Sequence, residues 1–210
     1  MAEIRADVKN GARRRVESEM RSMGFRALPG GAFEQPLAGV PFRSGWVAFP
    51  ERDDGPVFEM SVTVGIRDDR VSALMMELVA GTQFAATAAI NLGLIDDQQS
   101  VWSFSDLGQI EGHVTAMLLA LTTRGLPFVR EMASDTSKLE SFIRSYSMQA
   151  DVVIPLLRIA EGNADGAMLY VENAAVQLPE RGPYREFYLR LQSMIPKLER
   201  VASAYSGRTH

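Results

Sequence analysis

The chain has 210 residues and 46% of them are hydrophobic, so it can close a substantial core and is not disordered over most of its length. Its formal net charge of -4 provides no strong positive field for phosphate backbones, which argues against nucleic acid as the main partner. Cysteine is absent, and this excludes disulfides, thiolate metal sites and cysteine nucleophiles.

Apolar residues recur at steps of four in residues 4–23, which predicts an amphipathic helix that Gly24 ends. Basic residues cover much of the remaining surface of this helix, including the run Arg13, Arg14 and Arg15. A solvated helix face explains such a run, and the alternative is a docking patch for an acidic partner. The apolar stripe consists of Ile4, Val8, Ala12, Val16 and Met20.

Glycine and proline are frequent in residues 25–56, where Pro29-Gly30-Gly31 and the acidic run at 53–56 are the strongest turn signals. Between these turns we predict two short strands, at residues 32–35 and 42–49. The acidic turn is then expected to return the chain as a hairpin, which completes a meander of three antiparallel strands.

Residues 57–67 alternate more cleanly between apolar and polar than any other stretch, which predicts a strand with one buried and one wet face. Such a strand is typical of an antiparallel sheet covered on one side. The apolar face consists of Phe58, Met60, Val62, Val64 and Ile66. The polar positions are Glu59, Ser61, Thr63 and Arg67.

The period then changes, and residues 71–79 fit a helix capped by Asp68 or Asp69 and ended by Gly81. We predict further strands at residues 87–94 and 101–104. These two are expected to form a second hairpin that extends the same sheet.

From Leu107 onward the chain predicts helices, at residues 107–121, 127–132, 136–148, 151–160 and 164–177, followed by a long helix from Pro183. Gly125 and Pro127 are expected to end the first of them and open the next. The fold class is therefore α+β, with an antiparallel sheet of about five strands, an N-terminal helix and a helical C-terminal half. We expect a sheet domain at 1–105, a helical half at 106–205 that either packs on it or continues the same domain, and a frayed tail at 206–210.

No motif supplies chemistry: phosphate-binding loops and a nucleophile elbow are absent from the sequence. His113 is the one internal histidine, and a packing role is favoured over that of a general base because no partner nucleophile is identifiable. Turn and cap propensity accounts for the acidic pairs at 53–54, 68–69 and 96–97 without a metal ion. We therefore predict no catalytic residue, no metal site and no cofactor.

Features spread over residues 13–105 carry a resemblance. They are Met23-Gly24-Phe25 at the end of a helix, a glycine-rich turn into Phe33, a strand containing Trp46, a strand at 61–67 ending in VGIR, and the segment Asn91-Leu92-Gly93. In these features the chain resembles a group of uncharacterised bacterial α+β domains of unknown function. The resemblance implies a fold and no activity, so no functional residue follows from it.

The favoured function is that of a non-enzymatic cytoplasmic protein, of adaptor, immunity or chaperone type, that binds another macromolecule, most simply a protein. Cytoplasm is expected because residues 1–15 lack the apolar region of a secretory signal and no apolar run is long enough to span a bilayer. The expected binding residues are Glu59, Ser61, Thr63, Arg67, Arg13, Arg14 and Arg15.

One alternative is a small-molecule-binding domain or enzyme with a pocket between sheet and helices, in which His113, Glu111, Tyr170 and Arg158 would be tested first. Another is nucleic-acid binding through the basic N-terminal helix, which predicts a steep salt dependence. The sequence leaves the identity of the partner and the oligomeric state open.

Overall fold

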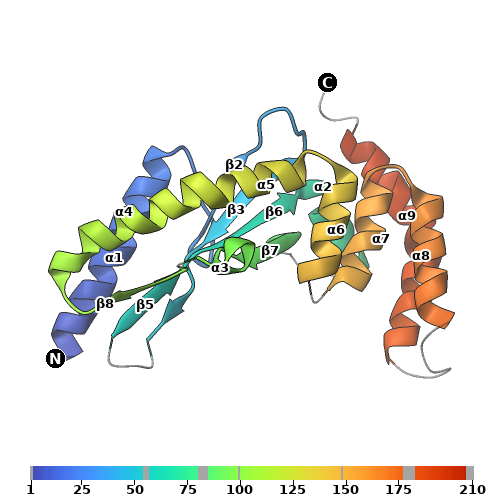
Figure 1. The fold of residues 1–210 in the computed structure, drawn as a ribbon. Coiled ribbons are helices and arrows are strands. Elements are labelled where there is room, and N and C mark those ends of the chain that lie inside the picture. The colour runs from blue at the N-terminus through green and yellow to red at the C-terminus, as the bar shows by residue number, and fades with distance from the viewer. Residues whose placement is uncertain are drawn as a thin grey trace. The chain divides into compact units, whose positions relative to one another are not determined.

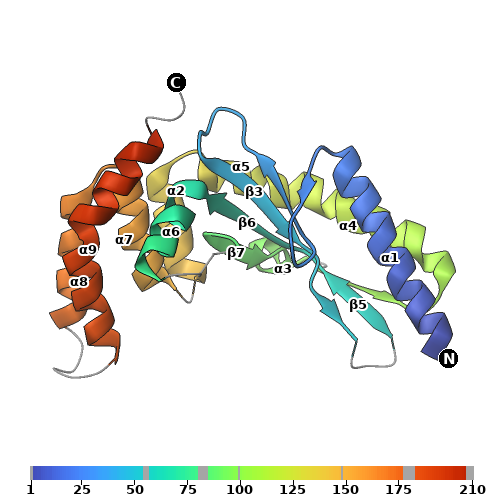
Figure 2. The same cartoon turned by 180° about the vertical axis from the view of Figure 1, so that it is seen from behind.

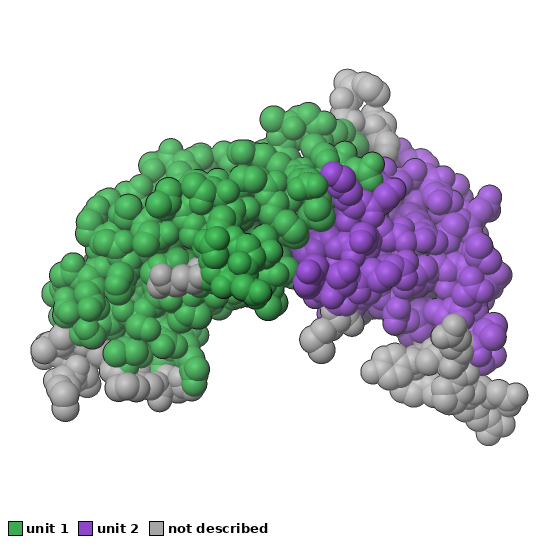
Figure 3. All heavy atoms as spheres, in the orientation of Figure 1, with its two compact units in different colours: residues 1–66, 89–135 green, residues 67–88, 136–210 purple. Residues whose placement is uncertain are grey.

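The computed structural model describes residues 2–53, 57–79, 85–98, 100–147, 149–176 and 183–206. Its residues group into two compact units, which Figure 3 colours separately. Unit 1 consists of Met1–Ile66 and Ala89–Asp135, and unit 2 consists of Arg67–Ala88 and Thr136–His210. The boundary predicted at residue 105 marks where strands give way to helices along the chain. It is a different kind of division from these two units, and it stays a prediction.

Unit 1 begins with α1 (Ala2–Ser22), the predicted N-terminal helix. Its stripe residues Val8, Ala12, Val16 and Met20 are all buried, and the side chain of Ile4 lies outside the described residues. Gly24 has a φ of 85°, and the Phe25 N–H donates to the Met20 carbonyl at 3.0 Å. This is the glycine-terminated helix end that the sequence predicts.

A five-stranded sheet, sheet A, has the order β1-β2-β3-β6-β7 (Figure 1). Strands β2 and β3 confirm the two short strands predicted between the turns, and β2 is antiparallel to both β1 and β3. The strands are β1 (Arg26–Ala27), β2 (Ala32–Pro36), β3 (Arg43–Ala48), β6 (Thr63–Asp68) and β7 (Ala88–Asn91).

The stretch 57–67 forms two strands rather than one, β5 (Phe58–Ser61) and β6, with Val62 between them. The predicted burial is confirmed, because Phe58, Met60, Val62, Val64 and Ile66 are all at most 2% exposed. Strand β5 belongs to a second, three-stranded sheet B with the order β4-β5-β8. Residues 54–56 of the predicted acidic turn lie outside the described residues. Strand β4 (Glu51–Arg52) pairs antiparallel with β5, and β6 is the strand next to β3 in sheet A.

The expectation of a second hairpin in the same sheet is wrong. Strand β7 ends at Asn91 and a short helix, α3 (Gly93–Asp96), follows it, so the predicted strand at 87–94 is shorter than expected. Strand β8 (Val101–Phe104) pairs antiparallel with β5 in sheet B, with Phe58 opposite Phe104. The aromatic contact explains this choice, since the two ring centroids lie 5.8 Å apart in the core.

Gly125 does not end the helix after Leu107. The 3-10 turn Leu107–Gln109 leads into α4 (Ile110–Ala120), and a π-helical turn, Leu121–Gly125, joins α4 to α5 (Leu126–Ala133). A Cβ at Gly125 would lie 2.9 Å from Cγ1 of Val64, so glycine lets the turn approach the sheet. Helix α4 packs against α1, as both Figure 1 and the reverse view in Figure 2 show.

Unit 2 holds α2 (Asp69–Leu78), α6 (Thr136–Tyr146), α7 (Ala150–Ala160), α8 (Ala164–Val176) and α9 (Pro183–Ser206). Helix α7 is central, because it contacts α2, α6, α8 and α9. Leu139, Phe142 and Ile143 are buried as predicted, whereas Tyr146 is 49% exposed. Gly81 and residues 207–210 of the predicted tail lie outside the described residues.

In the described part of the chain, no helix combines the length and the apolar character that crossing a membrane requires.

Candidate functional site

A groove of about 630 Å³ opens on unit 1 between α1 and the β1–β2 hairpin. Helix α1 supplies one wall, the hairpin supplies the other, and strands β4 and β5 close the end. Two edge strands border it, since β1 is the first strand of sheet A and β4 the first of sheet B. Its lining residues are Arg13, Val16, Glu17, Ala27, Leu28, Gly30, Gly31, Ala32, Phe33, Phe49, Pro50, Glu51 and Met60.

The groove has an apolar floor. Phe33 and Phe49 pack edge to face with their ring centroids 6.0 Å apart, and Met60 is 2% exposed beside them. At the hairpin turn, Gly30 and Gly31 have φ values of 83° and 79°, and a Cβ on either would have no neighbour within 4 Å. The glycines are therefore required by the backbone of the turn, and they also leave this end of the groove open.

The predicted basic residues of α1 are largely engaged with carboxylates. The Arg13 guanidinium donates to both carboxylate oxygens of Glu51 at 2.5 Å. Hydrogen bonding to Glu51 is the main reason why the pKa of the Arg13 guanidinium is raised. Lys9 pairs with Asp53 at 2.8 Å. Arg15 pairs with Glu19 and Glu111, while Arg14 is exposed and forms no ion pair within the described residues.

The predicted polar sheet face is divided between elements. Glu59 and Ser61 lie on the outer face of β5, where they line a shallow depression of about 200 Å³ together with Arg52 and Val101. Thr63 begins β6 in sheet A. Arg67 belongs to unit 2 and lies 3.3 Å from a carboxylate oxygen of Asp69. Of these residues, the structure brings Glu59 and Ser61 together.

The residues of the alternative pocket fall into separate units. His113 and Glu111 lie on α4 in unit 1, and the His113 ring packs edge to face on Phe104 with centroids 5.3 Å apart. In unit 2, the Arg158 guanidinium lies 5.3 Å from the Tyr170 ring centroid. The Tyr170 hydroxyl donates to Asp151 at 3.0 Å, and burial followed by this hydrogen bond raises the tyrosine pKa.

Arg158 is held by its own partners. It donates to both carboxylate oxygens of Glu140, at 3.0 and 2.5 Å, and to the Gly166 carbonyl at 2.9 Å. The hydrogen bond from Arg158 is the main cause that lowers the pKa of Glu140. These contacts use three of the five N–H donors of the guanidinium, and they join α6, α7 and α8.

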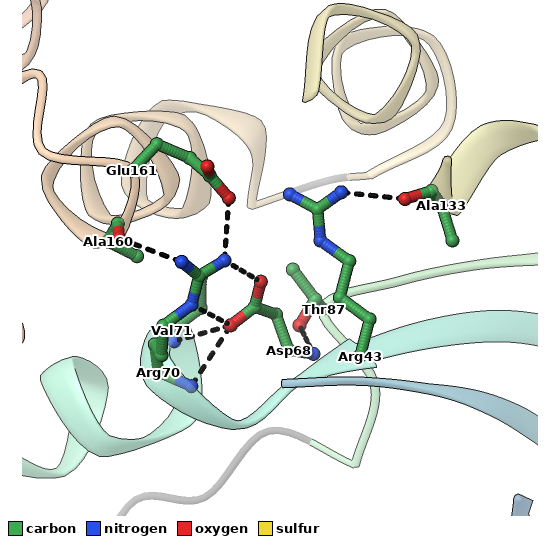
Figure 4. A network of polar contacts seen from close by, with 8 residues as sticks. All are labelled: Arg43, Asp68, Arg70, Val71, Thr87, Ala133, Ala160 and Glu161. Carbon is green, nitrogen blue, oxygen red and sulfur yellow. Dashed lines mark hydrogen bonds and ion pairs between the residues drawn. The ribbon is translucent and has the colours of Figure 1, made fainter. Parts of the chain in front are cut away.

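A buried polar cluster in unit 2 centres on Arg70, which is 8% exposed (Figure 4). Its guanidinium pairs with Asp68 at 2.9 Å and with Glu161 at 2.6 Å, and it also donates to the Ala160 carbonyl at the end of α7. Asp68, one of the two residues predicted to cap α2, does so by accepting from the Arg70 and Val71 N–H groups. We call this set the Arg70 cluster.

Each predicted acidic pair contributes at least one carboxylate to an ion pair. Asp53 binds Lys9, Asp68 binds Arg70, and Asp96 binds Arg124 at 2.7 Å. No group of at least three metal-ligating side chains occurs among the residues that the structure describes.

The groove was not predicted from the sequence, because its walls come from segments far apart along the chain. One signal was present: consecutive glycines after a proline, flanked by strands, indicate a turn with little side-chain bulk. Comparisons with family models, with curated proteins and with solved structures return no match for this chain.

Proposed function

We propose that this chain is a non-enzymatic binding protein whose partner is another protein, and that unit 1 contacts the partner through the groove. The observation that supports it most is the apolar floor beside two edge strands, a setting in which a polypeptide can bury side chains. A cytoplasmic location and the resemblance to bacterial α+β domains belong to the same proposal.

The charges near the groove favour a protein over a nucleic acid as partner. Arg13, Lys9 and Arg15 all pair with carboxylates of unit 1, so a phosphate backbone would have to displace those carboxylates. A polypeptide segment with apolar side chains needs no such exchange. Partner binding is accordingly expected to depend weakly on salt concentration.

The proposal is tested by placing a bulky side chain in the groove and measuring peptide binding. Short peptides from a displayed random library are selected on the immobilised full chain, and the affinity of each is then measured on two variants. Ala27→Trp places an indole on an exposed lining residue, and Leu169→Trp places one on an exposed position of α8 in unit 2. We expect Ala27→Trp to weaken the peptides by at least about tenfold and Leu169→Trp to leave them unchanged.

Equal affinity of the wild-type chain and Ala27→Trp for the selected peptides would contradict the proposal. So would a library that yields no binder, because an open groove with an apolar floor and accessible strand edges should recover some peptide.

A further inference from the structure

The pairing of β4 with β5 determines which backbone groups of β4 face outward. Glu51 is opposite Met60, and Arg52 is opposite Glu59. The Ser61 N–H donates to the Pro50 carbonyl at 2.9 Å, so Pro50 and Ser61 form a hydrogen-bonded position. Hydrogen-bonded and non-bonded positions alternate along antiparallel strands, so the N–H and C=O of Glu51 point away from β5.

The exposure of Glu51 agrees with this direction. The residue as a whole is exposed, but its side chain is only 22% exposed because it is bound by Arg13 and Lys9. Most of the exposure therefore belongs to its main chain. The same ion pairs hold the strand in place, so its outward N–H and C=O are pre-organised for a hydrogen-bonding partner.

The other edge strand at the groove is less suited to pairing. The Leu28 N–H donates to the Ala32 carbonyl at 2.7 Å, so Leu28 is a hydrogen-bonded position. By the same alternation, the main-chain N–H and C=O of Ala27 point away from β2. The neighbouring outward positions offer little, because the Phe25 N–H already donates to Met20 and Pro29 has no N–H. Strand β4 is therefore the better template.

Two depressions border β4. The groove holds the apolar floor at Phe33 and Phe49, the shallow depression holds Arg52 and Glu59, and Glu51 and Met60 line both. A strand added to β4 would direct alternate side chains to the two faces of sheet B. One set would lie toward the apolar floor, and the other would lie beside the charged and polar side chains of the shallow depression.

We propose that β4 binds an extended segment of a partner protein as an additional strand of sheet B, and that this segment alternates apolar and polar residues. This inference rests on the proposed function and specifies how the groove is occupied. The backbone hydrogen bonds at Glu51 supply affinity, and the two depressions select the alternating pattern.

Two variants at one position test the backbone contact with the selected peptides as probes. Glu51→Ala removes the ion pairs and keeps the N–H, whereas Glu51→Pro removes both. Because this N–H points outward, proline there breaks no bond to β5 and both variants should fold. We expect Glu51→Pro to bind the peptides about tenfold more weakly than Glu51→Ala does.

A second measurement does not depend on the folding of the proline variant. Backbone N-methylation, applied residue by residue to the tightest peptide, should weaken binding at the position whose N–H pairs with Glu51 and spare its immediate neighbours, because alternate N–H groups of an added strand face β4. Equal affinity of the two Glu51 variants, together with tolerance of N-methylation throughout, would overturn the strand addition. The proposed function would still stand in that case if Ala27→Trp abolished binding.

A second copy of this chain is the competing occupant. Sedimentation of the full chain decides between the two: a dimer that Glu51→Pro converts to monomers would assign β4 to self-association and overturn the inference. A monomer that binds the alternating peptides supports it.

Discussion

The two compact units differ in the polar groups that they present to a partner. In unit 2, the charged side chains nearest the core find partners within the unit: Arg70 with Asp68 and Glu161, and Arg158 with Glu140. In unit 1, an edge strand directs main-chain N–H and C=O groups outward beside an apolar groove. Saturated polar groups stabilise a fold, whereas unsaturated ones at a surface can bind a partner. We therefore propose that unit 1 is the part of the chain that recognises a partner.

The largest effect is expected at the Arg70 cluster. Arg70→Met leaves the Asp68 carboxylate, whose side chain is 0% exposed, without its guanidinium, so unfolding should become easier by about 3–5 kcal/mol. Denaturant unfolding followed by circular dichroism measures this change. The control is Lys197→Met, which removes an ion pair to Glu77 at a lysine that is 55% exposed and should cost at most about 0.5 kcal/mol. Equal effects of the two variants would mean that the cluster is not structural.

A pair of glycine variants tests how closely unit 1 is packed away from the groove. Gly125→Ala places a Cβ 2.9 Å from Val64 and 3.2 Å from Leu92, both buried, so it should destabilise by about 1–3 kcal/mol. Gly112→Ala on α4 meets nothing within 4 Å and should stabilise by about 0.5–1 kcal/mol through helix propensity. Opposite signs in thermal unfolding are the expected outcome. A stabilising Gly125→Ala would contradict the close contact between the π-helical turn and the sheet.

The acid stability of unit 2 should depend on Glu140. Its pKa in the folded chain is lowered, mainly by the hydrogen bond from Arg158, so its contribution to stability is present above the unfolded value of about 4.3. That contribution is lost as the pH falls through the folded pKa. Glu140→Gln should flatten the fall of the unfolding free energy below about pH 4.3. Glu172→Gln, at an exposed carboxylate of α8, is the matched control for the substitution itself.

The smallest effect on stability is expected in the groove itself. Ala27 is exposed, so Ala27→Trp should change the unfolding free energy by no more than about 0.5 kcal/mol. Its effect on peptide affinity should be large, which separates binding from folding. A loss of stability comparable to that of Gly125→Ala would show that Ala27 is part of the packed core and not of a free groove wall.

Local patterns predicted much of the secondary structure. The alternation of Phe58, Met60 and Val64 identified the buried face, the spacing on α1 identified its stripe, and the cap of α2 was narrowed to Asp68 or its neighbour. Each of these depends on residues close together in the chain. Strand pairing does not, and so the partner of β8 was assigned incorrectly: β5 lies about forty residues earlier, and no local pattern encodes that contact.

The division of residues 57–67 between two sheets was also missed, for a specific reason. Val62 is 0% exposed, so the apolar period continues through the point where the chain changes sheet. Gly125 was misread in a similar way, because a glycine followed two residues later by proline is typical of a helix end, whereas here it serves a close approach to Val64. The groove and the Arg70 cluster require knowledge of which distant segments meet.

Hydrogen–deuterium exchange on the full chain, with and without the tightest selected peptide, tests the assignment of recognition to unit 1 most directly. We predict that the peptide slows exchange in Arg26–Ala27 and Glu51–Arg52 and leaves α7 and α8 unchanged. Slower exchange confined to α7 and α8, with Glu51–Arg52 unaffected, would contradict it.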